Sequence, residues 1–98
     1  METALLKCSL TEVIRKLRDM LLQQGFLIEN FDEQRKVVLA YQNGKWFRNP
    51  KHILFELSSI DNSITRIDIT ASIEGKKKSR EAEEVIEEKI VTVIYKNF

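Results

Sequence analysis

Ser9-Leu10-Thr11-Glu12 is the stretch from which the fold of this chain can be worked out. A serine at a helix N-cap accepts a hydrogen bond from the amide of the third helical residue, and a glutamate there reaches back to the serine amide. Apolar residues then recur at spacings of three and four, and Gly25 follows as a residue suited to the left-handed helix stop. The pattern predicts a helix from about Leu10 to Gln24, with a buried side formed by Leu10, Val13, Ile14, Leu17, Met20 and Leu21.

The segments on either side of this helix have the character of strands. Thr3 to Cys8 suits either a short strand or an unstructured start. Residues 26–31 and 36–42 flank Asp32-Glu33-Gln34-Arg35, which predicts a hairpin with a four-residue loop that pairs Phe31 with Lys36. With that pairing the core side of the hairpin carries Phe26, Ile28, Val37, Leu39 and Tyr41, and the outer side carries Leu27, Phe31, Val38 and Ala40.

A second hairpin is predicted over residues 51–59 and 63–74. A three-residue loop, Ile60-Asp61-Asn62, keeps the apolar faces of its two strands in phase and puts Glu56 opposite Arg66. Ahead of it, Asn43-Gly44 is a tight-turn signal, and residues 45–50 form either a short returning strand or a loop. The core side of the second hairpin then consists of Ile53, Phe55, Leu57, Ile67, Ile69, Ala71 and Ile73.

The last segment, residues 79–97, predicts a second helix. Glutamates in its first turn favour a helix start because they lie near the positive end of the helix dipole. The β-branched run from Ile90 to Ile94 favours strands and keeps a strand alternative open. The predicted apolar stripe of the helix is Ala82, Val85, Ile86, Ile90, Val93, Ile94 and Asn97.

The order of these elements, (strand)-helix-four strands-helix, predicts an α+β fold. Its simplest arrangement is a two-layer sandwich in which one antiparallel sheet carries both helices on one face. This order resembles one half of the TATA-binding-protein fold, and it also resembles an abbreviated helix-grip domain of the kind that holds apolar ligands. Both resemblances rest on element order across most of the chain, so they assign a function to no residue.

Composition points to an ordinary globular chain. Its 98 residues are enough for one domain, 1–98, with 43% hydrophobic and 32% charged residues. The net charge of +1 indicates no class of partner by itself. Cys8 is the single cysteine and no apolar stretch approaches the roughly 20 residues that span a bilayer, so we expect a cytoplasmic protein without a membrane partner. Abundant Lys, Glu and Ile with a single Pro are typical of thermophilic proteins.

The inventory of reactive residues argues against catalysis. Cys8 and His52 are the only candidates for a thiol–imidazole pair, and Cys8 lies in an apolar segment as a small core filler would. The glycines are isolated, so no phosphate-binding loop is predicted. Glu83 and Glu87, like Glu84 and Glu88, have the i,i+4 spacing of a shared cation site, but a solvated helix face is the simpler explanation of that spacing. We therefore expect no enzymatic activity, no cofactor and no metal.

Two loop regions combine positive charge with aromatic residues. Residues 43–52 and 75–80 contain seven of the sixteen basic residues and no acid, and an up-and-down meander places both at the same end of the sheet. Phosphates bind Lys and Arg while bases stack on aromatic rings, so this end predicts nucleic acid or another polyanion as a partner. The candidate residues are Lys45, Trp46, Phe47, Arg48, Lys51, Lys76, Lys77, Lys78 and Arg80. The alternative explanation is structural: loops are usually charged, and Trp46 and Phe47 would close one end of the core.

The outer side of the first hairpin is the second candidate surface. Leu27, Phe31, Val38 and Ala40 would make it partly apolar, as a surface for a protein partner or a second copy of the chain is. Scattered exposed apolar residues are also normal on any protein. The sequence thus predicts a non-enzymatic interaction module that binds a polyanion through its basic end. The alternative is a structural or ligand-holding subunit that contacts a partner chain, or itself, through the open sheet face.

Overall fold

The first helix begins and ends where its local signals place it. In the computed structural model, which describes residues 1–42, 50–73 and 80–98, α1 spans Leu10–Gln23. Ser9 is extended, and its hydroxyl accepts a hydrogen bond from the Glu12 amide at 3.4 Å. Gly25 has a φ of +84°, and the amide of Phe26 donates to the carbonyl of Leu21 at 2.9 Å, which closes the helix with a Schellman motif. The predicted Ser9 cap and Gly25 stop are confirmed, while the Glu12 carboxylate pairs with Lys16 at 3.6 Å.

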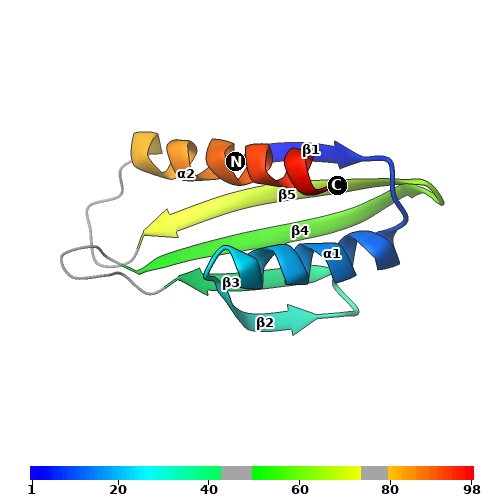
Figure 1. Cartoon of the computed structure of the whole chain (residues 1–98), viewed down its shortest axis with the longest axis horizontal. Coiled ribbons are helices and arrows are strands. Elements are labelled where there is room, and N and C mark those ends of the chain that lie inside the picture. Colours follow the sequence, from blue (N-terminus) through cyan, green and yellow to red (C-terminus); the bar gives the residue numbers. More distant parts are fainter. Residues whose placement is uncertain (43–49, 74–79) are drawn as a thin grey trace.

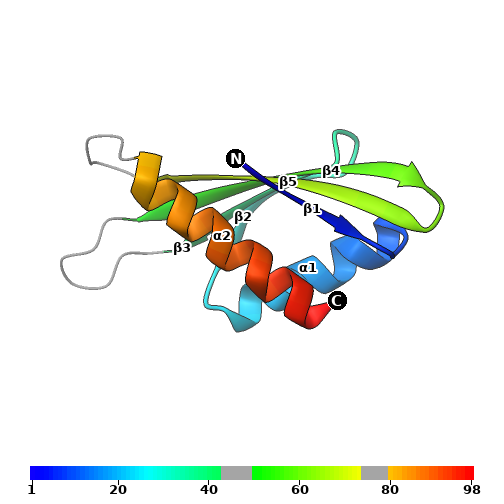
Figure 2. The same ribbon diagram turned by 90° about the horizontal axis from the view of Figure 1, so that it is seen from above.

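The described strands form one antiparallel sheet. They are β1 (Glu2–Leu6), β2 (Leu27–Asp32), β3 (Val37–Gln42), β4 (Lys51–Asp61) and β5 (Ile64–Ile73), in the spatial order β1-β5-β4-β3-β2. Figure 1 shows α1 and α2 (Arg80–Asn97) lying over this sheet, and Figure 2 shows both on the same side of it. The predicted α+β fold and element order are therefore confirmed. The segment before α1 is a strand, and it pairs with β5 at one edge of the sheet.

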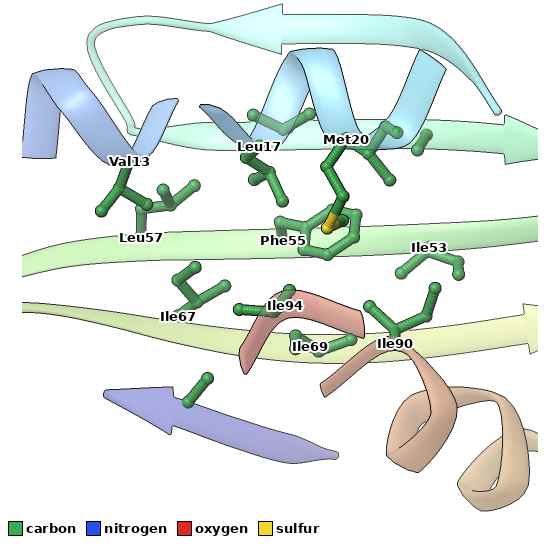
Figure 3. Close-up of a cluster of buried hydrophobic side chains, with 14 of the residues drawn as sticks. Val13, Leu17, Met20, Ile53, Phe55, Leu57, Ile67, Ile69, Ile90 and Ile94 are labelled. Carbon is green, nitrogen blue, oxygen red and sulfur yellow. The ribbon is translucent and has the colours of Figure 1, made fainter. Parts of the chain in front are cut away.

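The core lies between the sheet and the two helices. Leu17 of α1, Phe55 of β4 and Ile94 of α2 are fully buried and face one another across this layer (Figure 3). Ile53, Leu57, Ile67 and Ile69 complete the sheet side, as the period-two pattern predicts. Packing against the core keeps the β-branched run of α2 helical. Ile90 and Ile94, four residues apart on one side of the helix, both lie in the core.

The register of the β2–β3 hairpin differs from the prediction, and the correction changes which side chains are exposed. Phe31 pairs with Val38 rather than with Lys36, because Lys36 has a φ of +58° and belongs to the turn. A bulge at Glu29, between the paired residues Ile28 and Asn30, then shifts the rest of β2 by one residue. A one-residue shift exchanges the faces of a strand. Val38 and Ala40, which pair with the core residues Phe55 and Ile53 of β4, are fully buried. Val37, Leu39 and Tyr41 lie partly exposed on the outer face.

The β4–β5 hairpin has the predicted faces but a different turn. Asp61 pairs with Ile64 around a two-residue turn, and Ile60 is an extra residue in β4. The Asp61 carboxylate accepts the amide of Ser63 at 2.7 Å, which stabilises the tighter turn. The bulge restores the phase that the two-residue turn would have lost. Glu56 therefore lies opposite Asp68, not opposite Arg66 as predicted.

The first half of α2 buries carboxylates where an apolar residue was predicted. Val85 is 62% exposed, whereas Glu87 is fully buried. Glu87 accepts a hydrogen bond from the amide of Ala71 at 2.8 Å and lies 2.9 Å from the Met1 ammonium group. Burial raises the pKa of Glu87, but the ammonium group, the Ala71 amide and the charge of Arg80 lower the pKa by more, so it lies below its ordinary value. Glu87 is thus a buried anion with partners on three sides.

Candidate functional site

The sheet face opposite the helices is covered by no described helix, because α1 and α2 both lie on the other side of the sheet (Figure 2). Its outward positions follow from the strand pairing, which puts Leu39 next to Leu54 and Tyr41 next to His52. Val37 precedes this group on β3, and Leu27, which is 62% exposed, pairs with Tyr41 on β2. We call the cluster formed by Leu27, Val37, Leu39, Tyr41 and Leu54 the open-face cluster.

Carboxylates surround the open-face cluster. Asp32 pairs with Val37, which pairs in turn with Glu56, and Glu56 pairs with Asp68. The directly opposite Glu56 and Asp68 are two like charges, an arrangement that destabilises a sheet. The Thr3 hydroxyl donates a hydrogen bond to Asp68 at 2.7 Å, and this bond lowers the pKa of Asp68. Partial burial raises that pKa and Arg66 lowers it further, so the pKa lies below its ordinary value. Among the described residues Glu56 has no ion-pair partner.

His52 closes the end of the cluster nearest Tyr41. Its Nδ1 lies 3.2 Å from Oε2 of Glu29, the bulged residue of β2, and its ring centroid lies 5.1 Å from that of Tyr41. The side chain of His52 is 26% exposed. The bulge therefore brings a carboxylate to the imidazole from the neighbouring strand, and His52 has structural partners that account for its position.

The four residues predicted for the outer side of the first hairpin separate in the structure. Leu27 is exposed on the open face, as predicted. Val38 and Ala40 face the core, and Phe31 is partly buried against it on the helix side, so their predicted outward placement is wrong. The outward residues of β3 are instead Val37, Leu39 and Tyr41, which the prediction had placed in the core. Knowing of the bulge at Glu29 would have identified them, but a glutamate within a strand is not a recognisable sequence signal for a bulge.

Most of the predicted basic end lies outside the described residues. Lys45, Trp46, Phe47 and Arg48 fall in one such segment, and Lys76, Lys77 and Lys78 fall in the other. The pairing of Lys51 with both Gln42 and Ile73 shows that the described residues flanking these segments meet at one end of the sheet, as predicted. Arg80 lies 3.5 Å from Glu84 and 3.9 Å from Glu83 and Glu87.

The described residues form neither a thiol–imidazole pair nor a metal-binding cluster. The Cys8 carbonyl accepts a hydrogen bond from Thr65, whereas His52 pairs with Ser72, about 23 Å further along β5 by strand rise. The half-buried Cys8 thiol therefore does not meet the imidazole. No cluster of three or more His, Cys, Asp and Glu side chains within residues 1–42, 50–73 and 80–98 is arranged to hold a metal. Over the same residues, no helix has the length and apolar character needed to cross a bilayer.

Comparison with known protein families found no family model that matches the chain, and comparison with curated proteins found no match.

Proposed function

We propose that this chain is a non-enzymatic interaction module that binds a protein partner through its open sheet face. The observation that carries the proposal is the open-face cluster itself, an apolar group that no described element covers. Leu39 and Leu54 are neighbours at its centre and remain partly exposed. An uncovered apolar patch with a polar rim is typical of protein-binding surfaces.

The charge of the rim specifies the kind of partner. Glu29, Asp32, Glu56 and Asp68 lie around the cluster. Within the part of the chain that the structure describes, the arginines beside these carboxylates, Arg66 and Arg35, are already paired with Asp68 and Asp32. A second copy docked face to face would bring the same carboxylates together, which costs free energy. Nucleic acid would meet the same repulsion on this face. A partner with an apolar centre and Lys or Arg at its edge fits both the apolar cluster and its acidic rim. Such a partner would supply the positively charged group with which Glu56 could pair.

The test uses defined peptides and amide chemical shifts. An alternating Lys-Leu octapeptide is titrated into the protein beside two matched octapeptides, an alternating Glu-Leu and an alternating Lys-Ser sequence. We expect only the Lys-Leu peptide to shift the amides of β3 and β4. Glu56→Gln and Leu54→Ser should each weaken its binding, by about tenfold if each loses about 1.4 kcal/mol.

Two controls keep the test specific. Glu88→Gln removes an exposed carboxylate from α2, and it should leave the affinity unchanged because Glu88 lies away from the open face. Equal binding of the Glu-Leu peptide, or shifts confined to the helices, would contradict the proposal. A concentration-dependent dimer that Leu54→Ser dissociates would contradict it in favour of self-association.

Polyanion binding at the basic end is a second candidate function, supported by the meeting of the flanking residues Gln42, Lys51 and Ile73 at one end of the sheet. If it holds, the protein should bind a single-stranded oligonucleotide, and each phosphate contact removed should flatten the salt dependence of log affinity by about 0.7. Trp46→Ala should cost about 1–3 kcal/mol without changing that slope, because stacking releases no counterions. Absence of binding at low salt would dismiss this candidate.

A further inference from the structure

A separate groove lies on the helix side of the molecule, between α1 and the turn of the β2–β3 hairpin. Its volume is about 460 Å³. Its apolar lining comes from both elements and consists of Leu10, Ile14, Leu22 and Phe31.

Three cations line the same groove. Arg15 and Arg18 come from α1, and Lys36 comes from the hairpin turn. The Arg18 guanidinium lies 5.7 Å from the centroid of the Phe31 ring, so a positive charge stands directly beside the apolar lining. In the part of the chain that the structure describes, neither Arg15 nor Arg18 forms an ion pair. Asp19 and Glu33 also line the groove, so the lining keeps a net charge of +1.

The backbone at Lys36 is unusual for its residue type. Lys36 has a φ of +58°, the only positive value among the described residues other than glycine. A lysine in this conformation costs free energy that glycine would not incur. Its Nζ donates one hydrogen bond to the Glu33 carbonyl at 2.7 Å, and an ammonium group has two further hydrogens to donate. A strained residue that carries a charge into a groove is typical of a functional site.

We propose that this groove binds a small amphipathic anion, an apolar chain or ring that ends in one carboxylate or phosphate. The apolar part would lie against Leu22 and Phe31, and the anionic group would be held by Arg15, Arg18 and Lys36. A volume of about 460 Å³ suits a small molecule, since small-molecule pockets occupy about 300–1,000 Å³. The unpaired arginines specify the charge of the ligand, and the apolar lining excludes a free inorganic anion as the preferred one.

The experiment titrates the protein with decanoate, decyl phosphate and decanol, followed by amide chemical shifts and calorimetry. We expect both anions to shift amides of α1 and the β2–β3 turn, and decanol to bind at least about tenfold more weakly, the loss of about 1.4 kcal/mol. The tighter of the two anions identifies the head group as carboxylate or phosphate. Equal binding of decanol, or shifts confined to the open-face cluster, would overturn the proposal.

Matched variants separate the groove from general surface effects. Arg18→Gln should weaken decanoate binding by about tenfold, the loss of about 1.4 kcal/mol. Arg35→Gln, in the turn of the β2–β3 hairpin, should leave the affinity unchanged because Arg35 is 84% exposed and does not line the groove. Leu22→Gln should weaken binding of all three probes, and Val85→Gln should not, because Val85 is similarly exposed on the other helix. Equal effects of a variant and its control would overturn the proposal. The peptide titration tests the open-face proposal independently of these results.

Discussion

Replacing Glu87 should test whether a buried carboxylate joins α2 to the edge of the sheet. β1 pairs with β5 only as far as Ile69, so the amide of Ala71 lies beyond the start of β1. The Glu87 carboxylate accepts the hydrogen bond from this amide at 2.8 Å, where a longer β1 would have provided a carbonyl. Figure 1 shows how α2, β1 and β5 are arranged. Ala71 is 2% exposed, so water cannot readily replace the carboxylate as acceptor.

The magnitude follows from these contacts. Glu87→Ala leaves the buried amide of Ala71 without an acceptor, which typically costs about 1–3 kcal/mol of unfolding free energy. The Met1 ammonium group and Arg80 are each more than half exposed, so water can solvate the charges that lose their partner. Glu87→Gln retains an oxygen for the Ala71 amide and loses only the charge, so we expect a smaller cost of about 1–2 kcal/mol. Glu84→Gln is the matched control, because Glu84 pairs with Arg80 on the same helix with its side chain 51% exposed, and an exposed pair contributes about 0–1 kcal/mol.

The assay is urea unfolding of the three variants and the parent chain across pH. Because the pKa of Glu87 is lower in the folded protein than in the unfolded chain, its ionisation stabilises the fold fully above the unfolded value of about 4.3. That stabilisation is lost as the pH falls through the folded pKa. The gap between the parent and Glu87→Gln should therefore be present at neutral pH and close in acid. A gap of zero at neutral pH, or one that widens in acid, would refute this account of Glu87.

Three further predictions concern α1 and the hairpin turn, each measured as a change in the free energy of unfolding. Ser9→Ala should cost about 0.5–2 kcal/mol by removing the helix cap, and a neutral result would mean that the cap contributes nothing. Leu17→Ala should cost about 2–5 kcal/mol because Leu17 is fully buried, whereas Arg15→Ala should stay within about 0.5 kcal/mol because Arg15 is exposed. Lys36→Gly should stabilise the protein by about 0.5–1 kcal/mol while weakening decanoate binding, and a loss of stability would show that its left-handed backbone is not strained.

The sequence predicts α1 well because its signals are local. The Ser9 cap and the Gly25 stop each act within a few residues, so no knowledge of the rest of the chain is needed. The faces of β4 and β5 are predicted equally well, since alternation places every second residue in the core. Their exact pairing is not, because the Asp61 side chain stabilises a two-residue turn and the bulge at Ile60 compensates for it.

The interior of α2 shows a different limit of sequence patterns. Periodicity assigns Val85 to the buried stripe and treats Glu87 as a solvated residue, and both assignments are wrong. The reason lies in the unpaired amide of Ala71, which requires an acceptor and is 16 residues away in the chain. A helical pattern reports how apolar residues share a face. It carries no information about which sheet amides lack a partner, so a buried glutamate of this kind follows only from the tertiary structure.

The bulge at Glu29 links the two proposed surfaces. Without the extra residue, Ile28 and Phe31, three positions apart, would point to opposite faces of β2. With it, both contact the core side, and Phe31 lines the groove beneath Arg18. Glu29 itself reaches His52 on the open face. One inserted residue therefore supplies the aromatic wall of the groove and a carboxylate at the rim of the open-face cluster, two features that regular alternation could not place on opposite sides of one strand.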